Sequence, residues 1–99
     1  MGLMMVRARI KADSIDEIEA AGSAVISALH REQVQGIRYA TCRLSDGVTY
    51  LNLLQLDDGI QNPLPALPES KEFQANLKRW LAEPATSESL TIIGSYRLF

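Results

Sequence analysis

The same order of secondary structure, strand then helix then strand, is predicted twice along this chain of 99 residues. Short runs in which apolar and polar side chains alternate predict the strands, and longer runs with apolar side chains every three or four residues predict the helices. The predicted elements are residues 5–12, 14–34, 37–44, 48–57, 68–82 and 90–99. This order is the split βαβ arrangement, an antiparallel four-stranded sheet with both helices on one face. The predicted fold class is therefore α+β and ferredoxin-like (βαββαβ), as a single domain over residues 1–99.

Local signals mark the first strand and the first helix. From Val6 to Ala12 apolar and basic residues alternate strictly, which is typical of a strand with one buried face. Ser14 and Glu17 have the spacing of a capping box, in which each side chain bonds a free backbone amide at the start of a helix. Gly36 is expected to end that helix, because glycine adopts the left-handed conformation at little cost.

Asp46 and Gly47 predict a two-residue turn between the middle strands, which then form a hairpin. One face of this hairpin is rich in polar and aromatic groups, with the pairs Tyr39–Leu54, Thr41–Asn52 and Arg43–Tyr50. The other face pairs Ala40, Cys42 and Leu44 with Leu53, Leu51 and Thr49. Because the second face is more apolar, it is the one expected to meet the helices.

The second half of the chain contains a loop and an apolar end. Residues 57–67 include Gly59 and two prolines, so they predict an extended surface loop that could act as a lid. The last predicted strand, residues 90–99, carries apolar side chains on both faces, which suits burial between two subunits.

Composition restricts the partners. Ten basic against twelve acidic residues give a formal net charge of -2, without a basic stripe, so no nucleic acid is expected. No apolar run approaches the ~18 residues of a membrane helix, so no membrane is expected. Cys42 is the only cysteine, which excludes a disulfide framework and favours a reducing compartment, the cytoplasm. A chain of this size has a modest core, so a homodimer is the expected assembly.

The polar and aromatic face of the hairpin is the most site-like part of the sequence. Tyr39, Tyr50 and Asn52, with Thr41 and Arg43, could bind a phenolate or carboxylate and stabilise charge as it develops. The plainer alternative is a polar dimer interior, in which arginines pair with acids of the other subunit. Arg7 and Arg9 are expected on this same polar side.

Two aromatic residues share the inner stripe of the second helix. Phe73 and Trp80 lie seven residues apart, so they could form the apolar walls of a site for a flat ligand, or could simply be core. His30, near the end of the first helix, is expected to be structural or solvated, with a general base as the alternative. Glu19 and the other acids of the first helix are interpreted as capping or solvated positions, and Cys42 as an inert thiol.

A short motif before the second helix suggests a family. Residues 67–73 read Leu-Pro-Glu-Ser-Lys-Glu-Phe, and the whole chain resembles the dimeric α/β-barrel superfamily, most closely its antibiotic biosynthesis monooxygenase-like group. That group commonly has His, two residues, Ser or Thr, two residues, and Phe at this place. Ser70 and Phe73 match, whereas Leu67 replaces the histidine, which argues against haem chemistry. The resemblance implies two sheets closed into one barrel.

Two functions follow from the residues and the resemblance. The first is a cofactor-independent monooxygenase-like enzyme acting on a small aromatic or polyketide-like compound, with Tyr39, Tyr50 and Asn52 as hydrogen-bond partners and Phe73 and Trp80 as apolar walls. The second is a non-catalytic homodimeric module that binds a small molecule or another protein. No metal-ligand cluster or phosphate loop is present in the sequence, so no cofactor is expected. If the tyrosine face and the aromatic stripe lie on opposite sides of the sheet, two separate sites result.

Overall fold

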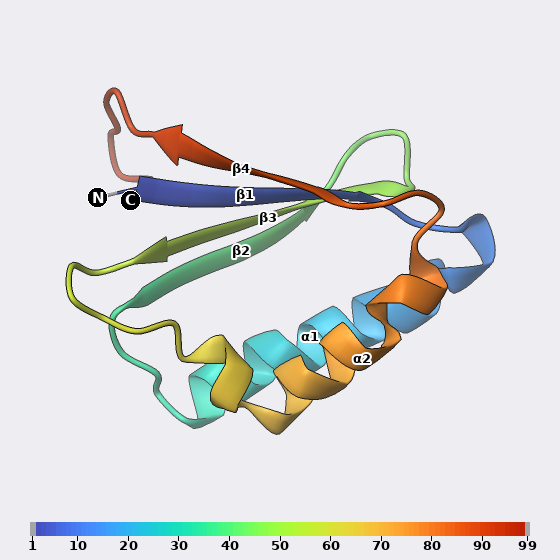
Figure 1. Cartoon of the computed structure of the whole chain (residues 1–99), viewed down its shortest axis with the longest axis horizontal. Helices are drawn as coiled ribbons and strands as arrows, with labels where there is room; N and C mark the ends of the chain where they lie inside the picture. Colours follow the sequence, from blue (N-terminus) through green and yellow to red (C-terminus); the bar gives the residue numbers. More distant parts are fainter. Residues whose placement is uncertain (1, 99) are drawn as a thin grey trace.

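A computed structural model describes residues 2–98 and contains the predicted order of elements (Figure 1). The strands and helices are β1 (Gly2–Arg9), α1 (Ile15–Arg31), β2 (Ile37–Arg43), β3 (Thr49–Leu56), α2 (Pro68–Trp80) and β4 (Thr86–Thr91), with short 3-10 turns at Ala12–Ser14 and Leu64–Ala66. The strands pair antiparallel in the order β2-β3-β1-β4. Both helices cover one face of this sheet. The predicted ferredoxin-like α+β fold is confirmed.

The last strand differs from its prediction. β4 begins at Thr86 and ends at Thr91, where it pairs with Gly2 at the start of β1. This is the last pair of the ladder among the described residues, and residues 92–98 are not a strand. Their apolar side chains are largely exposed, at Ile93, Tyr96 and Leu98. The predicted strand at 90–99 is therefore wrong in its bounds, and Phe99 lies outside the described residues.

Ser14 is the N-cap residue of α1 as predicted, but its predicted capping bonds and the predicted end of the helix at Gly36 are wrong. Ser14 makes no capping bond to the helix, because its hydroxyl donates instead to Asp13 Oδ1 at 3.3 Å. The helix ends at Arg31, and the residue in the left-handed conformation after it is Gln33, with φ 49°. Gly36 lies further along, with φ 79°, where an added Cβ would approach Ile60 Cγ1 to 2.9 Å. Glycine is therefore needed there for a close approach rather than to end the helix.

The hairpin register is confirmed, although its loop is longer than predicted. The three predicted pairs are present, Tyr39–Leu54, Thr41–Asn52 and Arg43–Tyr50. The Leu44 amide bonds the Thr49 carbonyl at 2.8 Å, so residues 45–48 form the loop instead of Asp46 and Gly47 alone. The Asp46 carboxylate accepts bonds from the Val48 and Thr49 amides and, at 2.6 Å, from the Thr49 hydroxyl. These bonds, led by the Thr49 hydroxyl, lower the pKa of Asp46 from 3.8 to about 2.

Replacing Asp46 with alanine is expected to lower the thermal midpoint near neutral pH. Since the pKa of Asp46 is lower in the folded than in the unfolded chain, its contribution is present above the unfolded value of about 3.9 and is lost as the pH falls towards about 2. The difference in midpoint between wild type and Asp46→Ala should therefore shrink over that range. Asp58→Ala, in another exposed loop, is the matched control. A difference that does not change with pH would contradict this role of the ionised carboxylate.

The sheet face that meets the helices is the opposite of the one predicted. The core cluster contains Tyr50, together with Ile10, Ile18 and Trp80, so the tyrosine face of the hairpin faces the helices. The arginines of β1 explain this orientation. Arg7 and Arg9 occupy one face of β1, and Ala8 on its other face pairs with Tyr50. Packing the helices on the face of β1 that carries no arginine therefore places Tyr50 beneath them.

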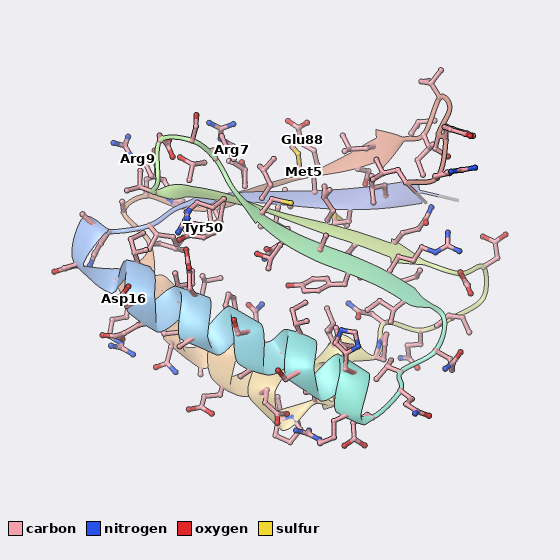
Figure 2. All side chains as sticks on the ribbon, turned by 180° about the vertical axis from the view of Figure 1, so that it is seen from behind. Met5, Arg7, Arg9, Asp16, Tyr50 and Glu88 are labelled. Atoms are coloured by element: carbon pink, nitrogen blue, oxygen red, sulfur yellow. The ribbon has the colours of Figure 1, made fainter. Side chains whose placement is uncertain are left out.

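The outer face, which has no helix, holds the residues that were expected in the core. Arg7 and Arg9 also lie there, and not beside the tyrosines as predicted (Figure 2). Its apolar side chains alternate with those that face the helices, and they include Leu3, Met5, Ala40, Cys42, Leu51 and Leu53. None of the described helices is long and apolar enough to span a membrane.

Candidate functional site

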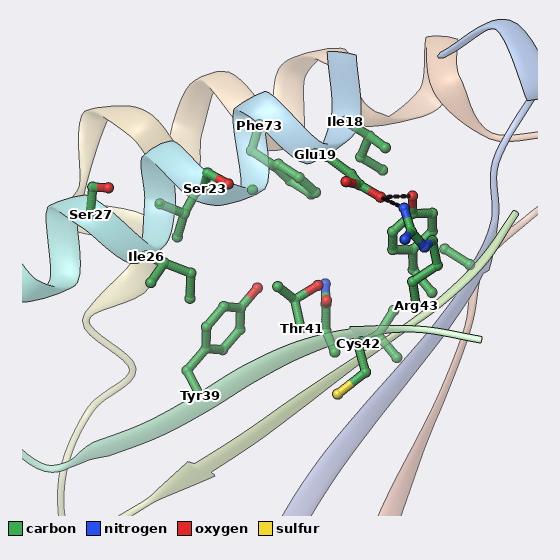
Figure 3. Close-up of a pocket in the computed structure, with 16 residues that line it drawn as sticks. Ile18, Glu19, Ser23, Ile26, Ser27, Tyr39, Thr41, Cys42, Arg43 and Phe73 are labelled. Atoms are coloured by element: carbon green, nitrogen blue, oxygen red, sulfur yellow. Dashed lines mark hydrogen bonds and ion pairs between the residues drawn. The ribbon is translucent and has the colours of Figure 1, made fainter. Parts of the chain in front are cut away.

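A cavity of about 450 Å³ lies between α1 and the tyrosine face of the sheet (Figure 3). The helix contributes seven residues to its lining, of which Gly22, Ser23 and Ser27 are small: Ile18, Glu19, Gly22, Ser23, Val25, Ile26 and Ser27. The other lining residues are Val6, Ala8, Tyr39, Thr41, Cys42, Arg43, Tyr50, Asn52 and Phe73. Small residues such as Gly22 and Ala8 do not fill the space between the two layers, so the cavity remains open.

The structure brings four of the five predicted site residues together. Tyr39, Tyr50 and Asn52 line the cavity from the sheet, and Phe73 lines it from α2. The tyrosine face and the aromatic helix stripe therefore border one site and not two. Trp80 is not among the lining residues of this cavity.

Trp80 lies in the core beside the site. Only 3% of its surface is exposed, and its ring packs edge-on against Phe73 with the ring centroids 5.7 Å apart. Its indole Nε1 donates a hydrogen bond to Glu17 Oε2 at 2.9 Å. Trp80 thus supports the Phe73 wall from behind.

Glu19 is a site residue that the sequence interpretation missed. Its Oε2 accepts hydrogen bonds from the Tyr50 hydroxyl and from Arg43 Nη1, each at 2.5 Å (Figure 3). The bond from Tyr50 and the charge of Arg43 hold the pKa of Glu19 below its usual value, against the opposing effect of desolvation. Burial and the bond to Glu19 raise the pKa of Tyr50. The site therefore holds an ionised carboxylate beside a protonated phenol.

Other polar groups in the cavity have no partner within residues 2–98. The hydroxyl of Tyr39 and the amide of Asn52 make no side-chain hydrogen bond in this part of the chain. Burial raises the pKa of Tyr39, which keeps its phenol protonated near neutral pH. Figure 3 shows the Tyr39 hydroxyl pointing into the cavity. Tyr39 and Asn52 can thus donate hydrogen bonds to a bound molecule.

A second cavity, of about 480 Å³, adjoins the first. It shares Val6, Tyr39 and Asn52 with the first cavity, so these residues lie between the two. Residues of the predicted lid loop line it, together with α2 and the sheet: Met4, Leu54, Asn62, Leu64, Pro65, Ser70, Lys71 and Gln74. The loop thus lies over the far end of one longer cleft.

His30 and Cys42 take no part in this site through their reactive atoms. His30 is exposed near the end of α1 and lines neither cavity. The Cys42 sulfur points away from the cavity, towards the outer face (Figure 3), and is exposed. Among residues 2–98 no group of three His, Cys, Asp or Glu side chains is placed to hold a metal ion.

Comparisons with known proteins concern the fold. No family model matches the sequence, and no curated protein matches it either. The structure is similar to Rv0793 from Mycobacterium tuberculosis, with a TM-score of 0.74 and 17% identity over 95% of this chain and 96% of that one. It is also similar to an antibiotic biosynthesis monooxygenase, with a TM-score of 0.74 and 10% identity over 95% and 100% of the two chains.

A third similar structure carries a description of its activity. SnoaB from Streptomyces nogalater, described as a cofactor-independent oxygenase, has a TM-score of 0.70 and 14% identity over 97% of this chain and 96% of its own. At these identities the similarity concerns the fold alone. The resemblance stated from the sequence is thereby confirmed, and this chain has the fold of the antibiotic biosynthesis monooxygenase-like proteins.

Proposed function

We propose that this protein is a cofactor-independent oxygenase of a small phenolic aromatic compound, which binds in the cleft between α1 and the sheet. The observation that carries the proposal is the cavity of about 450 Å³, in which aromatic and aliphatic walls surround hydrogen-bond donors and one ionised carboxylate. Such a mixture is typical of small-molecule sites. The similar fold of SnoaB, which is described as a cofactor-independent oxygenase, supports the same reaction class.

The proposed chemistry relies on the substrate's own reactivity with O2. A phenolic compound with an acidic CH2 group loses a proton to form an electron-rich anion, which reduces O2. In the overall reaction CH2 and O2 give a carbonyl group and water, so atoms and electrons balance without a cofactor. Glu19 supplies a proton acceptor, and Tyr39 and Asn52 donate hydrogen bonds to the oxygen on which charge develops.

The test uses dithranol, a tricyclic phenol whose central CH2 is oxidised by O2 to a carbonyl. Wild-type protein should accelerate O2 uptake and quinone formation above the uncatalysed rate. Asn52→Ala should lower the rate by about 10²–10³-fold, because it removes a donor to the developing charge. Tyr50→Phe should also lower it, because Tyr50 positions Glu19. Cys42→Ser, whose side chain points away from the cavity, is the control.

Two outcomes would contradict this assignment. Wild-type turnover in both Asn52→Ala and Tyr50→Phe would remove these residues from the reaction. Binding of dithranol by the wild-type protein without faster oxidation would instead support the non-catalytic binding module.

We also propose that two copies pair through the outer face of the sheet. No described helix covers the apolar side chains there, and the segment after β4 lies beside the end of the sheet (Figure 1). This segment, here called the tail, adds exposed apolar side chains, Ile93, Tyr96 and Leu98. Uncovered apolar surface of this kind is typical of subunit interfaces. Pairing would bury both the outer face and the tail, and would leave the cleft beneath α1 in each copy.

Leu51→Glu is expected to shift the protein from dimer to monomer, because it places a charge on the outer face. Sedimentation velocity at several concentrations measures the shift. Ala24→Glu makes the matching change on the exposed side of α1 and should leave the dimer intact. An unchanged dimer in Leu51→Glu would place the interface elsewhere on the protein. A monomeric wild type would exclude the proposed pairing.

A further inference from the structure

The cavity of about 450 Å³ beneath α1 forms one end of the cleft, here called the α1 end. We infer that this end selects uncharged aromatic compounds that carry a hydroxyl group, and that it rejects carboxylates. This inference rests on the proposed function, since it names the chemical class that the same site would accept. It depends on the charges around the cavity and on the hydrogen-bonding atoms that remain free there.

The charges of the cavity cancel within the protein. Among residues 2–98, Glu19 and Arg43 are the only acidic and basic side chains that line it, and they form an ion pair at 2.5 Å. The sequence interpretation offered Arg43 as a partner for a bound anion. In the structure its guanidinium is already engaged by Glu19, so an entering anion finds no uncompensated positive charge at this end of the cleft.

The free oxygen of Glu19 favours a hydrogen-bond donor. Oε2 receives both the Tyr50 and the Arg43 bonds, whereas Oε1 has no partner within the described chain. Figure 3 shows this second oxygen turned away from Arg43, on the side of the cavity. A hydroxyl group can donate to it, but a carboxylate has no proton to donate and meets a like charge.

The nearby neutral groups suit the same ligand class. Tyr39 and Asn52 can each donate and accept, so they can pair with a second hydroxyl or a carbonyl group. Phe73 provides an aromatic surface, and the helix adds Val25 and Ile26. A flat hydroxylated compound therefore satisfies both the apolar walls and the polar atoms.

The adjoining cavity, beyond Tyr39 and Asn52, is lined by one basic side chain of the described residues, Lys71. A carboxylate could bind there without entering the α1 end. Measurements in the Lys71→Gln background remove that positive charge, so the remaining preference reports on Glu19 and Arg43 alone.

The experiment compares 2-naphthol with 2-naphthoate by calorimetric titration near neutral pH. Phenols of this kind are neutral there, whereas the carboxylate is ionised. In wild type and in Lys71→Gln, 2-naphthol should bind at least about tenfold more tightly than 2-naphthoate. In Glu19→Gln the freed Arg43 should raise the affinity for 2-naphthoate by at least about tenfold, while the affinity for 2-naphthol falls. In Arg43→Gln the affinity for 2-naphthoate should fall below its wild-type value.

The variants are suited to this comparison because their side chains are substantially exposed, at 43% for Glu19 and 52% for Arg43, so the fold should be retained. A higher affinity for 2-naphthoate in Glu19→Gln and a lower one in Arg43→Gln would support the inference. Equal binding of both ligands, with no response of 2-naphthoate to Glu19→Gln, would overturn it while leaving the cleft as an aromatic site. Failure of both ligands to bind wild type would overturn the inference and the proposed function together.

Discussion

Trp80→Ala is expected to lower the free energy of unfolding by about 3–5 kcal/mol, as deletion of a large buried aromatic side chain commonly does. Only 3% of the Trp80 surface is exposed, and it packs in one cluster with Ile10, Ile18 and Tyr50. Its loss would leave a void between α1, α2 and the start of β3, where Tyr50 lies. The edge-on contact with Phe73 would disappear as well. Urea unfolding followed by circular dichroism measures the change.

Two variants separate packing from hydrogen bonding at this position. Trp80→Phe keeps an aromatic ring but loses the indole N–H, so it should cost less than Trp80→Ala. Glu17→Ala removes the acceptor of the indole bond, together with the exposed ion pair between Glu17 and Arg79, and should cost about 1 kcal/mol. An unfolding midpoint of Trp80→Ala close to that of wild type would contradict the core position of Trp80.

Gly22→Phe is expected to lower the affinity for aromatic ligands by at least about 100-fold. The reason is that a buried phenyl ring in the site excludes a ligand that needs the same space. Gly22 lines the cavity beneath α1, and a Cβ added there would meet no atom within 4 Å. The phenyl ring would therefore extend into open space and fill it. Titration of each variant with 2-naphthol measures the loss.

Gly22→Ala is the matched control for the helix backbone. Alanine is favoured over glycine within a helix by about 0.8–1.0 kcal/mol, and its methyl group leaves most of the cavity free. This variant should therefore be slightly more stable than wild type and should still bind 2-naphthol. Wild-type affinity in Gly22→Phe would place the ligand outside the cavity.

The hairpin illustrates what local sequence can and cannot predict. Asp46 and Gly47 predicted a turn, and counting outward from it gave the register that the structure contains. The register does not say which face of the hairpin meets the helices, and apolar content alone suggested the wrong one. That choice depended on β1, where Arg7 and Arg9 lie on the face that the helices do not cover. Pairing of β1 with β3 is a long-range contact, which the hairpin sequence does not contain.

The same long-range contact explains why Glu19 was missed. On the helix alone, Glu19 is one of several acids beside the apolar stripe, and its neighbours give no reason to separate it from a solvated residue. Its role comes from Tyr50 and Arg43, which approach it only when the tyrosine face lies beneath α1. The available signal was its spacing from Gly22 and Ser23, since residues three and four apart share one side of a helix. The last residue of β4, Thr91, likewise pairs with a distant partner, Gly2 of β1.

The most direct test of the central claim, a ligand site between α1 and the tyrosine face, is an amide chemical-shift titration with 2-naphthol. The expected result is a set of saturable shifts at residues 18–27 of α1 and at Tyr39 and Asn52, which are lost in Gly22→Phe. Shifts confined to the outer face, around Met5 and Leu51, or no saturable shifts at all, would contradict a ligand site beneath α1.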